Sequence, residues 1–204
     1  MTPADFKPLW SGQRAADSPL KLVGVRGALE IGHPNRVDIY DDLIFVVDEN
    51  AGTVTAWLAS VDPSLPLILN PINPDGCAQL VDGVHLFGRG IHKGNPAWPC
   101  LIQAEDFTID RLDTNGNVKG QESGDFGIHL HSGGTGTDTK RFSAGCQIIH
   151  NGDGYFQDPT WSGFIQTIYA AMKAAGIAVV PYLLMDAADF TLPIPDTVSN
   201  PVTP

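Results

Sequence analysis

The sequence predicts a mainly β protein of the β-rich α+β class. Its 204 residues include 22 glycines and 16 prolines, a mixture typical of a turn-rich chain rather than a helical bundle. Several short runs are rich in β-branched and aromatic residues, and only one stretch has strong helical periodicity. The length is that of one domain with enough apolar residues to form a core.

Most of the predicted elements are strands. Residues 39–47 and 53–61 flank a turn of Asp, Glu, Asn, Ala and Gly, so they are expected to form a hairpin. Further extended segments are expected at 81–90, 101–112 and 177–185. Asn115-Gly116 indicates another hairpin, and Pro181 would place the last strand at an edge or a bulge.

One amphipathic helix is predicted near residues 158–175. Asp158 can cap it and Pro159 suits its first position. Apolar residues then recur at helical spacing, namely Trp161, Phe164, Ile165, Ile168 and Met172. This apolar stripe should pack on the sheet.

The chain divides into three parts by composition. Residues 1–20 have little periodicity and are expected to form a loosely packed N-terminal arm. Residues 21–190 are expected to form a single catalytic domain. The proline-rich residues 191–204 are expected to be a disordered tail.

Charge and hydropathy exclude some partners. The net charge of −11 argues against nucleic acid, because phosphate binding requires a basic surface. No apolar run has the length of a membrane helix. The sequence does not indicate an oligomeric state.

The chemistry is expected in residues 127–147, GIHLHSGGTGTDTKRFSAGCQ. If the first half is a strand, Ile128 and Leu130 point to the core while His129 and His131 share the opposite face. Residues 132–138 then form an exposed loop of turn residues, which lets the chain return so that Ser143-Ala144-Gly145-Cys146 lies beside His131.

Cys146 and His131 form a candidate nucleophile and base. A neighbouring imidazole that takes the proton makes a cysteine a usable nucleophile. Gly145 suits a sharp turn, and the N–H groups around Cys146 could form an oxyanion hole. Cys77 and Cys100 either pair as a disulfide or, like Cys146, stay reduced. The polar turn 91–96 is expected to be solvated, although His92 or Lys93 could reach the cleft.

His131-Ser132, the fifteen-residue step to the cysteine and Ser143-Ala144-Gly145-Cys146 resemble the catalytic motif of the L,D-transpeptidase (YkuD) family. The resemblance implies a mixed β-sandwich fold, with Cys146 as nucleophile, His131 as base, and Ser132 or Gly133 orienting the imidazole. Ala144 replaces the family's usual second histidine, and Gln147-Ile148 also depart from its pattern. The motif is more similar to a divergent branch of phage and uncharacterised bacterial proteins.

The resemblance implies a cysteine acyl-transfer enzyme that acts on peptidoglycan peptide stems through a thioester, which an amine or water resolves. It implies substrate contacts from the residues around the pair: His129, Gly133, Ser143, Ala144, Gln147 and Arg141. No cofactor and no metal are expected. Residues 1–21 lack the form of a signal peptide. We therefore expect either delivery to the bacterial wall by a phage-type (lysis protein) or non-classical route, or a leader that has been removed.

Two other functions stay open. His129-Leu130-His131 is similar to the HxH strand of zinc metalloendopeptidases, although the accompanying His-x-x-x-Asp is absent after His33, His85 and His92. The chain could also be an inert wall-binding or virion protein.

Overall fold

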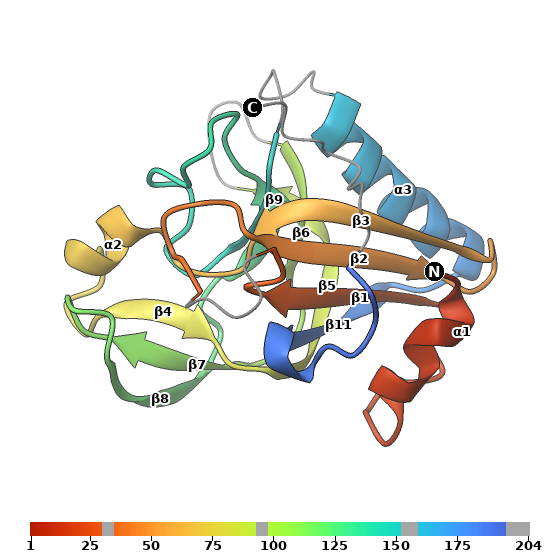
Figure 1. The fold of residues 1–204 in the computed structure, drawn as a ribbon, viewed down its shortest axis with the longest axis horizontal. Coiled ribbons are helices and arrows are strands. Elements are labelled where there is room, and N and C mark those ends of the chain that lie inside the picture. Colours follow the sequence, from red (N-terminus) through yellow and green to blue (C-terminus); the bar gives the residue numbers. More distant parts are fainter. Residues whose placement is uncertain (30–34, 93–97, 152–158, 195–204) are drawn as a thin grey trace.

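The structure is a computed structural model that describes residues 1–29, 35–92, 98–151 and 159–194. Eight strands close into a barrel in the order β1-β11-β5-β6-β9-β10-β3-β2 (Figure 1). Their bounds are β1 Leu20–Arg26, β2 Asp42–Asp48, β3 Thr53–Ser60, β5 Gly83–His92, β6 Trp98–Gln103, β9 His129–Ser132, β10 Gln147–Ile149 and β11 Val179–Asp186. The mainly β class is confirmed.

The barrel closes because β1 is paired along both edges. It runs antiparallel to β2 and parallel to β11. A second parallel pair, β9 with β10, lies elsewhere in the barrel. A mixed β-sandwich was expected, but the structure is a closed mixed barrel. The reason is that β1, which would otherwise form an edge of the sheet, also pairs with β11 from the C-terminal part of the chain.

The predicted first hairpin is confirmed. β2 and β3 pair from Asp42↔Ala59 to Asp48↔Thr53. In the turn, the Asp48 carboxylate accepts a hydrogen bond of 2.9 Å from the N–H of Ala51. Gly52 then has a φ of +68°, a conformation that glycine adopts readily.

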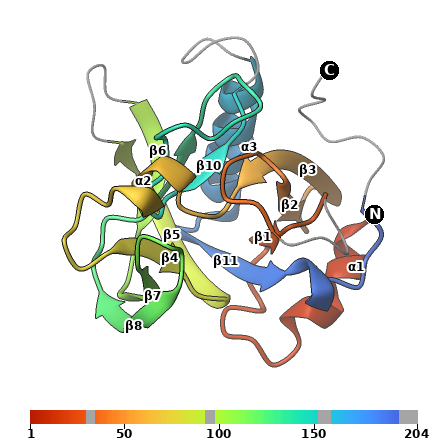
Figure 2. The same ribbon diagram turned by 60° about the vertical axis from the view of Figure 1, so that its left-hand side comes forward.

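A three-stranded sheet lies beside the barrel (Figure 2). It consists of β4 (Cys77–Leu80), β7 (Phe107–Leu112) and β8 (Val118–Gly124). The stretch expected to be extended over 101–112 is broken between β6 and β7, so its two halves belong to different sheets. The predicted Asn115-Gly116 hairpin joins β7 to β8, and Asp113 accepts hydrogen bonds from the N–H groups of Asn115 and Asn117.

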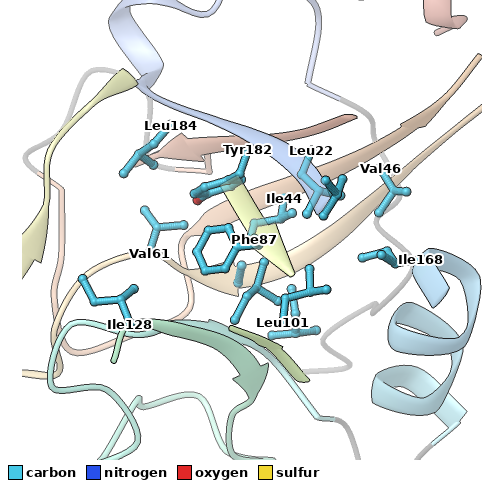
Figure 3. Packing of buried hydrophobic residues seen from close by; sticks show 14 of the residues in the cluster. Leu22, Ile44, Val46, Val61, Phe87, Leu101, Ile128, Ile168, Tyr182 and Leu184 are labelled. Atoms are coloured by element: carbon cyan, nitrogen blue, oxygen red, sulfur yellow. The ribbon is translucent and has the colours of Figure 1, made fainter. Parts of the chain in front are cut away.

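The main core fills the barrel (Figure 3). Alternate residues of each strand point inward, as Phe87, Leu101 and Tyr182 do. The predicted helix is α3 (Pro159–Ala175), which adds Phe164, Ile165, Ile168 and Met172 to the same core. The expected packing of its apolar stripe is thus confirmed for these residues, whereas the capping residue Asp158 lies outside the described ones.

A second core covers the outer face of β1, β2 and β11. The N-terminal segment forms α1 (Pro3–Phe6) and the 3-10 helix η1 (Lys7–Trp10), whose Phe6 and Trp10 are 1% and 2% exposed. Residues 3–10 are therefore packed, and the expectation of a loose arm is wrong here, because these two aromatic side chains bury against Phe45 and its neighbours. Leu192 and Ile194, from the segment expected to be disordered, pack against the same core, and the tail from 195 lies outside the described residues.

The remaining elements are short. They are α2 (Leu65–Leu69), in the loop after β3, and the 3-10 helix η2 (Ala187–Asp189). Pro181 does not mark an edge strand, since β11 pairs with both β1 and β5. Pro181 lies one residue before Tyr182, the first residue of β11 that pairs with β1. The strand therefore tolerates the missing N–H of Pro181. None of the described helices is long and apolar enough to cross a membrane.

Candidate active site

Strands β9 and β10 present an apolar face to the barrel and a face of imidazole and sulfur groups to the outside. Ile128 and Leu130 belong to the main core, at 2% and 0% exposure. His129 and His131 alternate with them and so lie on the outer face. Cys146 packs against Ile148 in a cluster separate from the main core. The predicted alternation of the two histidines is confirmed.

The loop between the two strands returns the chain as predicted, but its first residues, 132–134, are buried rather than exposed, because the backbone there bonds Tyr40 and Ile149. β9 and β10 pair in parallel, with Leu130 opposite Gln147 and His131 opposite Ile148. The N–H of Gly133, a predicted site residue, donates to Ile149 O at 2.7 Å. Gly133 therefore helps to fix the backbone of the loop. Cys146, one residue before Gln147, is thereby held on the strand beside the histidines.

One ring nitrogen of His131 makes a hydrogen bond, and the other makes none to the described residues. Its Nδ1 donates to the backbone carbonyl of Ser132 at 2.7 Å, which is the orienting contact expected of Ser132. Because a carbonyl only accepts, the proton sits on Nδ1 and Nε2 carries the lone pair. Among the described residues Nε2 has no hydrogen-bond partner. Burial lowers the pKa of His131 to about 3, and His92 adds to this effect, so the ring is neutral at pH 7.

The thiol of Cys146 is partly exposed and close to the backbone of the preceding strand. Its Sγ accepts from the N–H of His129 at 3.4 Å and lies 4.0 Å from the carbonyl of Gly127. Burial raises the pKa of Cys146 to about 11. Within the part of the chain that the structure describes, no hydrogen bond joins Sγ to an imidazole nitrogen. The resting pair is thus a neutral thiol and a neutral imidazole.

Ser143 and Gly145 shape the turn before the nucleophile. Gly145 has a φ of +132°, and a Cβ there would lie 2.8 Å from the carbonyl oxygen of Ala78 in β4. Its N–H donates to Ser143 Oγ at 3.1 Å, and that hydroxyl donates to Cys146 O at 2.6 Å. The N–H of Gly145 is therefore already used, and the fully buried Ser143 has a structural position rather than the expected substrate contact.

Gln147 also departs from the expected substrate contact. Its side chain points into the barrel and is fully buried. The amide donates to Val61 O at 3.2 Å and accepts from Tyr182 Oη at 2.9 Å. These bonds anchor the start of β10 to the core, because a buried amide must be satisfied there.

Arg141 points away from the thiol. Its guanidinium donates to Pro66 O at 3.4 Å, and with Lys140 it lines a pocket against α2. Ala144, in contrast, is exposed and lines another pocket, of about 390 Å³, together with Arg111, Asp125 and Phe126. This second pocket is lined by Phe126, next to Gly127, and by Ala144, two residues before Cys146, so it is the cavity to consider for substrate.

The site also contains His92, which the sequence offered only as an alternative to a solvated turn, and Cys100, for which the sequence predicted no role in the site. Nδ1 of His92 lies 3.0 Å from Nδ1 of His129, and its ring stacks on that of His131 with centroids 4.0 Å apart. His92 therefore reaches the cleft instead of lying in a solvated turn. Sγ of Cys100 lies 3.9 Å from Nδ1 of His129. Cys77, Cys100 and Cys146 are all free, which matches the alternative without a disulfide.

The HxH pair does not form the expected metal arrangement. The described His, Cys, Asp and Glu residues contain one set of three with atoms close enough for a shared ion, and it includes His129 but not His131. Nε2 of His85 is occupied by Val81 O at 2.9 Å, and His33 lies outside the described residues. Comparison of the chain with family models, curated proteins and solved structures gives no match.

Proposed function

We propose that this chain is a cysteine acyl-transfer enzyme of the L,D-transpeptidase type that acts on the peptide stems of peptidoglycan at the bacterial cell wall. The observation that carries the proposal is the pairing of β9 with β10. It holds Cys146 and His131 on one outer face, and the carbonyl of Ser132 fixes the tautomer that leaves Nε2 basic.

The residues support a general-base mechanism. Nε2 of His131 takes the proton of the Cys146 thiol as Sγ attacks the carbonyl between an L-centre and a D-residue. The tetrahedral intermediate collapses to a thioester, and the imidazolium returns the proton to the departing D-amino acid. An amine of a second stem then resolves the thioester as a crosslink, or water resolves it as a shortened stem.

The resting charges favour proton transfer during attack over a preformed ion pair. The pKa of Cys146 is raised to about 11 and that of His131 is lowered to about 3, both chiefly by burial. Between about pH 3 and pH 11 the free protein therefore keeps a protonated Cys146 thiol and a neutral His131 imidazole, the two protonation states from which the mechanism starts. We expect kcat/KM to show a broad plateau with respect to these two groups instead of a bell centred near neutrality.

The pocket beside Ala144 is suited to an anionic stem. Arg111 lines it, and the Nε of this buried side chain has no hydrogen-bond partner among the described residues. Its NH2 pairs with Glu122 at 2.9 Å and its NH1 donates to Gly76 O, so the guanidinium is held at the wall of the pocket. The positive charge of Arg111 would attract a stem carboxylate there.

A second function is supported by the same charges. Among the described residues no imidazole nitrogen bonds the thiol, and the nearby His131 is hard to protonate, which also fits a wall-binding or virion protein whose site is inert. Such a protein would bind stems without making new products, so product analysis separates the two functions.

The test is digestion of purified peptidoglycan from several wall types, followed by mass analysis of the stems. Wild type should yield crosslinked dimers or shortened stems, whereas Cys146→Ala should yield neither. Ser11→Ala is the control, since Ser11 is an exposed residue of the N-terminal segment and the change should leave the products unchanged. Absence of wild-type products on every wall type would exclude the enzymatic function.

A further inference from the structure

The outer face of β5, β6 and β9 carries a group of nitrogen and sulfur ligands that the acyl-transfer mechanism does not use. His92 ends β5, Cys100 lies in β6 and His129 begins β9. These three strands are neighbours in the barrel, with Cys100 opposite Gly90 and Ile102 opposite His129. The register therefore brings together three residues that are up to 37 positions apart in the chain.

The spacing of the ligand atoms is that of a small coordination site. Nδ1 of His92 and Nδ1 of His129 are 3.0 Å apart, and Sγ of Cys100 is 3.9 Å from the latter. All three ligand atoms lie within 4.8 Å of one another. Around tetrahedral zinc, bond lengths of 2.0–2.1 Å to nitrogen and 2.3 Å to sulfur give N···N near 3.3 Å and N···S of about 3.6 Å. The two His129 distances differ from these values by only a few tenths of an ångström, and His92 and Cys100 lie within 4.8 Å of each other.

The ligands are held in orientation by their surroundings. The ring of His92 stacks on His131 and lies 5.3 Å from the ring of Trp98, at 30° to it. The backbone carbonyl of Cys100 accepts a hydrogen bond of 2.7 Å from the hydroxyl of Tyr169 in α3. Cys100 is fully buried while both histidines are partly exposed, so a cation can enter from solvent. Such support from neighbouring groups is typical of metal sites.

We propose that His92, Cys100 and His129 bind a divalent transition-metal cation, with zinc as the best match. Imidazole and thiolate are borderline-soft ligands that favour zinc, cobalt, nickel or copper over magnesium or calcium. Three protein ligands leave a fourth position for water or a small ligand. Binding releases the thiol proton of Cys100 to solvent. The proton between the two Nδ1 atoms moves to a ring Nε2, so that both Nδ1 lone pairs can bond to the cation. This site adjoins the proposed nucleophile, since the N–H of His129 donates to Cys146 Sγ, but cation binding does not require acyl transfer.

Cobalt(II) substitution tests the site directly. The full chain is stripped with a chelator and titrated with Co²⁺, and the thiolate-to-cobalt charge-transfer absorption is followed in the near ultraviolet. Wild type should show this band, Cys100→Ser should lose it, and Cys77→Ser, the matched control, should keep it. Cys146→Ala should also keep it. The proposal is overturned if wild type shows no band, or if Cys146→Ala rather than Cys100→Ser abolishes it.

A second measurement guards against misfolding of the Cys100 variant. His92→Ala changes a partly exposed ligand at the end of a strand and should leave the fold intact by circular dichroism. In competition with a chromophoric chelator it should weaken Zn²⁺ binding by more than the roughly 10–100-fold that loss of a merely supporting group costs. Zn²⁺ should raise the Tm of wild type but not of His92→Ala. Equal Zn²⁺ affinity in folded His92→Ala and wild type would also overturn the proposal.

Discussion

The two faces of the same four strands, β5, β6, β9 and β10, differ in chemistry, apart from the Gln147 amide on the inner face and the apolar Ile148 on the outer one. Their inner face carries apolar side chains such as Phe87, Leu101 and Leu130, all at 0% exposure in the core. Their outer face carries the polar and sulfur-bearing residues His92, Cys100, His129, His131 and Cys146. Each strand contributes to both because side chains alternate along it. The inner face therefore supplies most of the buried apolar packing, and the outer face holds the groups to which the proposal assigns chemistry.

The largest expected effect concerns the outer face. His131→Asn removes the basic Nε2 while it keeps a neutral side chain of similar polarity. Because general-base catalysis contributes about 10²–10⁴-fold, kcat/KM on stem peptides should fall by that factor. The free energy of unfolding should change little by comparison. A variant with wild-type kcat/KM would show that His131 is not the base.

On the inner face, Leu101→Ala should do the opposite. Truncation of a fully buried leucine should lower the free energy of unfolding by about 2–5 kcal/mol, through lost burial and the cavity it leaves. Chemical denaturation measures this, and activity per folded molecule should be retained. Leu69→Ala, at a leucine that is 58% exposed, is the matched control and should cost far less. If Leu101→Ala lost activity but not stability, the contrast between the inner and outer faces would be wrong.

The protonation of His131 should also make the free energy of unfolding depend on pH. Its pKa is lowered from 6.5 to about 3 by burial, so between these values the unfolded chain binds a proton that the folded chain does not. Its contribution to stability is therefore present above pH 6.5 and decreases as pH falls towards 3. The decrease should be on the order of a few kcal/mol.

The measurement is urea denaturation of wild type and His131→Asn at pH 7 and pH 4. The acid loss should be smaller in the variant, although His85 and His92, whose pKa values are also lowered by burial, contribute in both proteins. Equal acid losses would mean that His131 is not a buried neutral group.

The smallest expected effect is at Gly145, in the turn before Cys146. Gly145→Ala puts a side chain at a φ of +132° and against the carbonyl of Ala78. Backbone strain of this kind costs about 1–3 kcal/mol, and the displaced turn should also lower activity. Thermal denaturation and product analysis measure the two effects. Gly116→Ala is a useful comparison, since its Cβ would meet nothing within 4 Å although φ is also positive.

Local pattern was sufficient to predict part of this molecule. Alternation along 128–131 predicted which face the two histidines share, and the turn composition at 48–52 predicted the β2–β3 hairpin. Helical spacing predicted α3. These features depend on residues that are near one another in the chain, so periodicity reports them directly.

The rest depends on strand order and register, which one sequence does not reveal. Barrel closure requires β1 to pair with β11, more than 150 positions later. The approach of His92 and Cys100 to His129 follows from the order β5-β6-β9, and no local pattern marks it. Phe6 and Trp10 lack a regular apolar period, so their burial under β2 could not be read from spacing.

The central claim, that Cys146 forms an acyl-enzyme, is tested most directly by mass spectrometry of the protein after incubation with a peptidoglycan stem tetrapeptide. The account predicts an adduct of the acyl tripeptide on the Cys146 peptide that hydroxylamine releases and that Cys146→Ala lacks. It also predicts slower formation in His131→Asn. An adduct on Cys100 or Cys77 instead, or no adduct with any stem that the protein binds, would contradict the account.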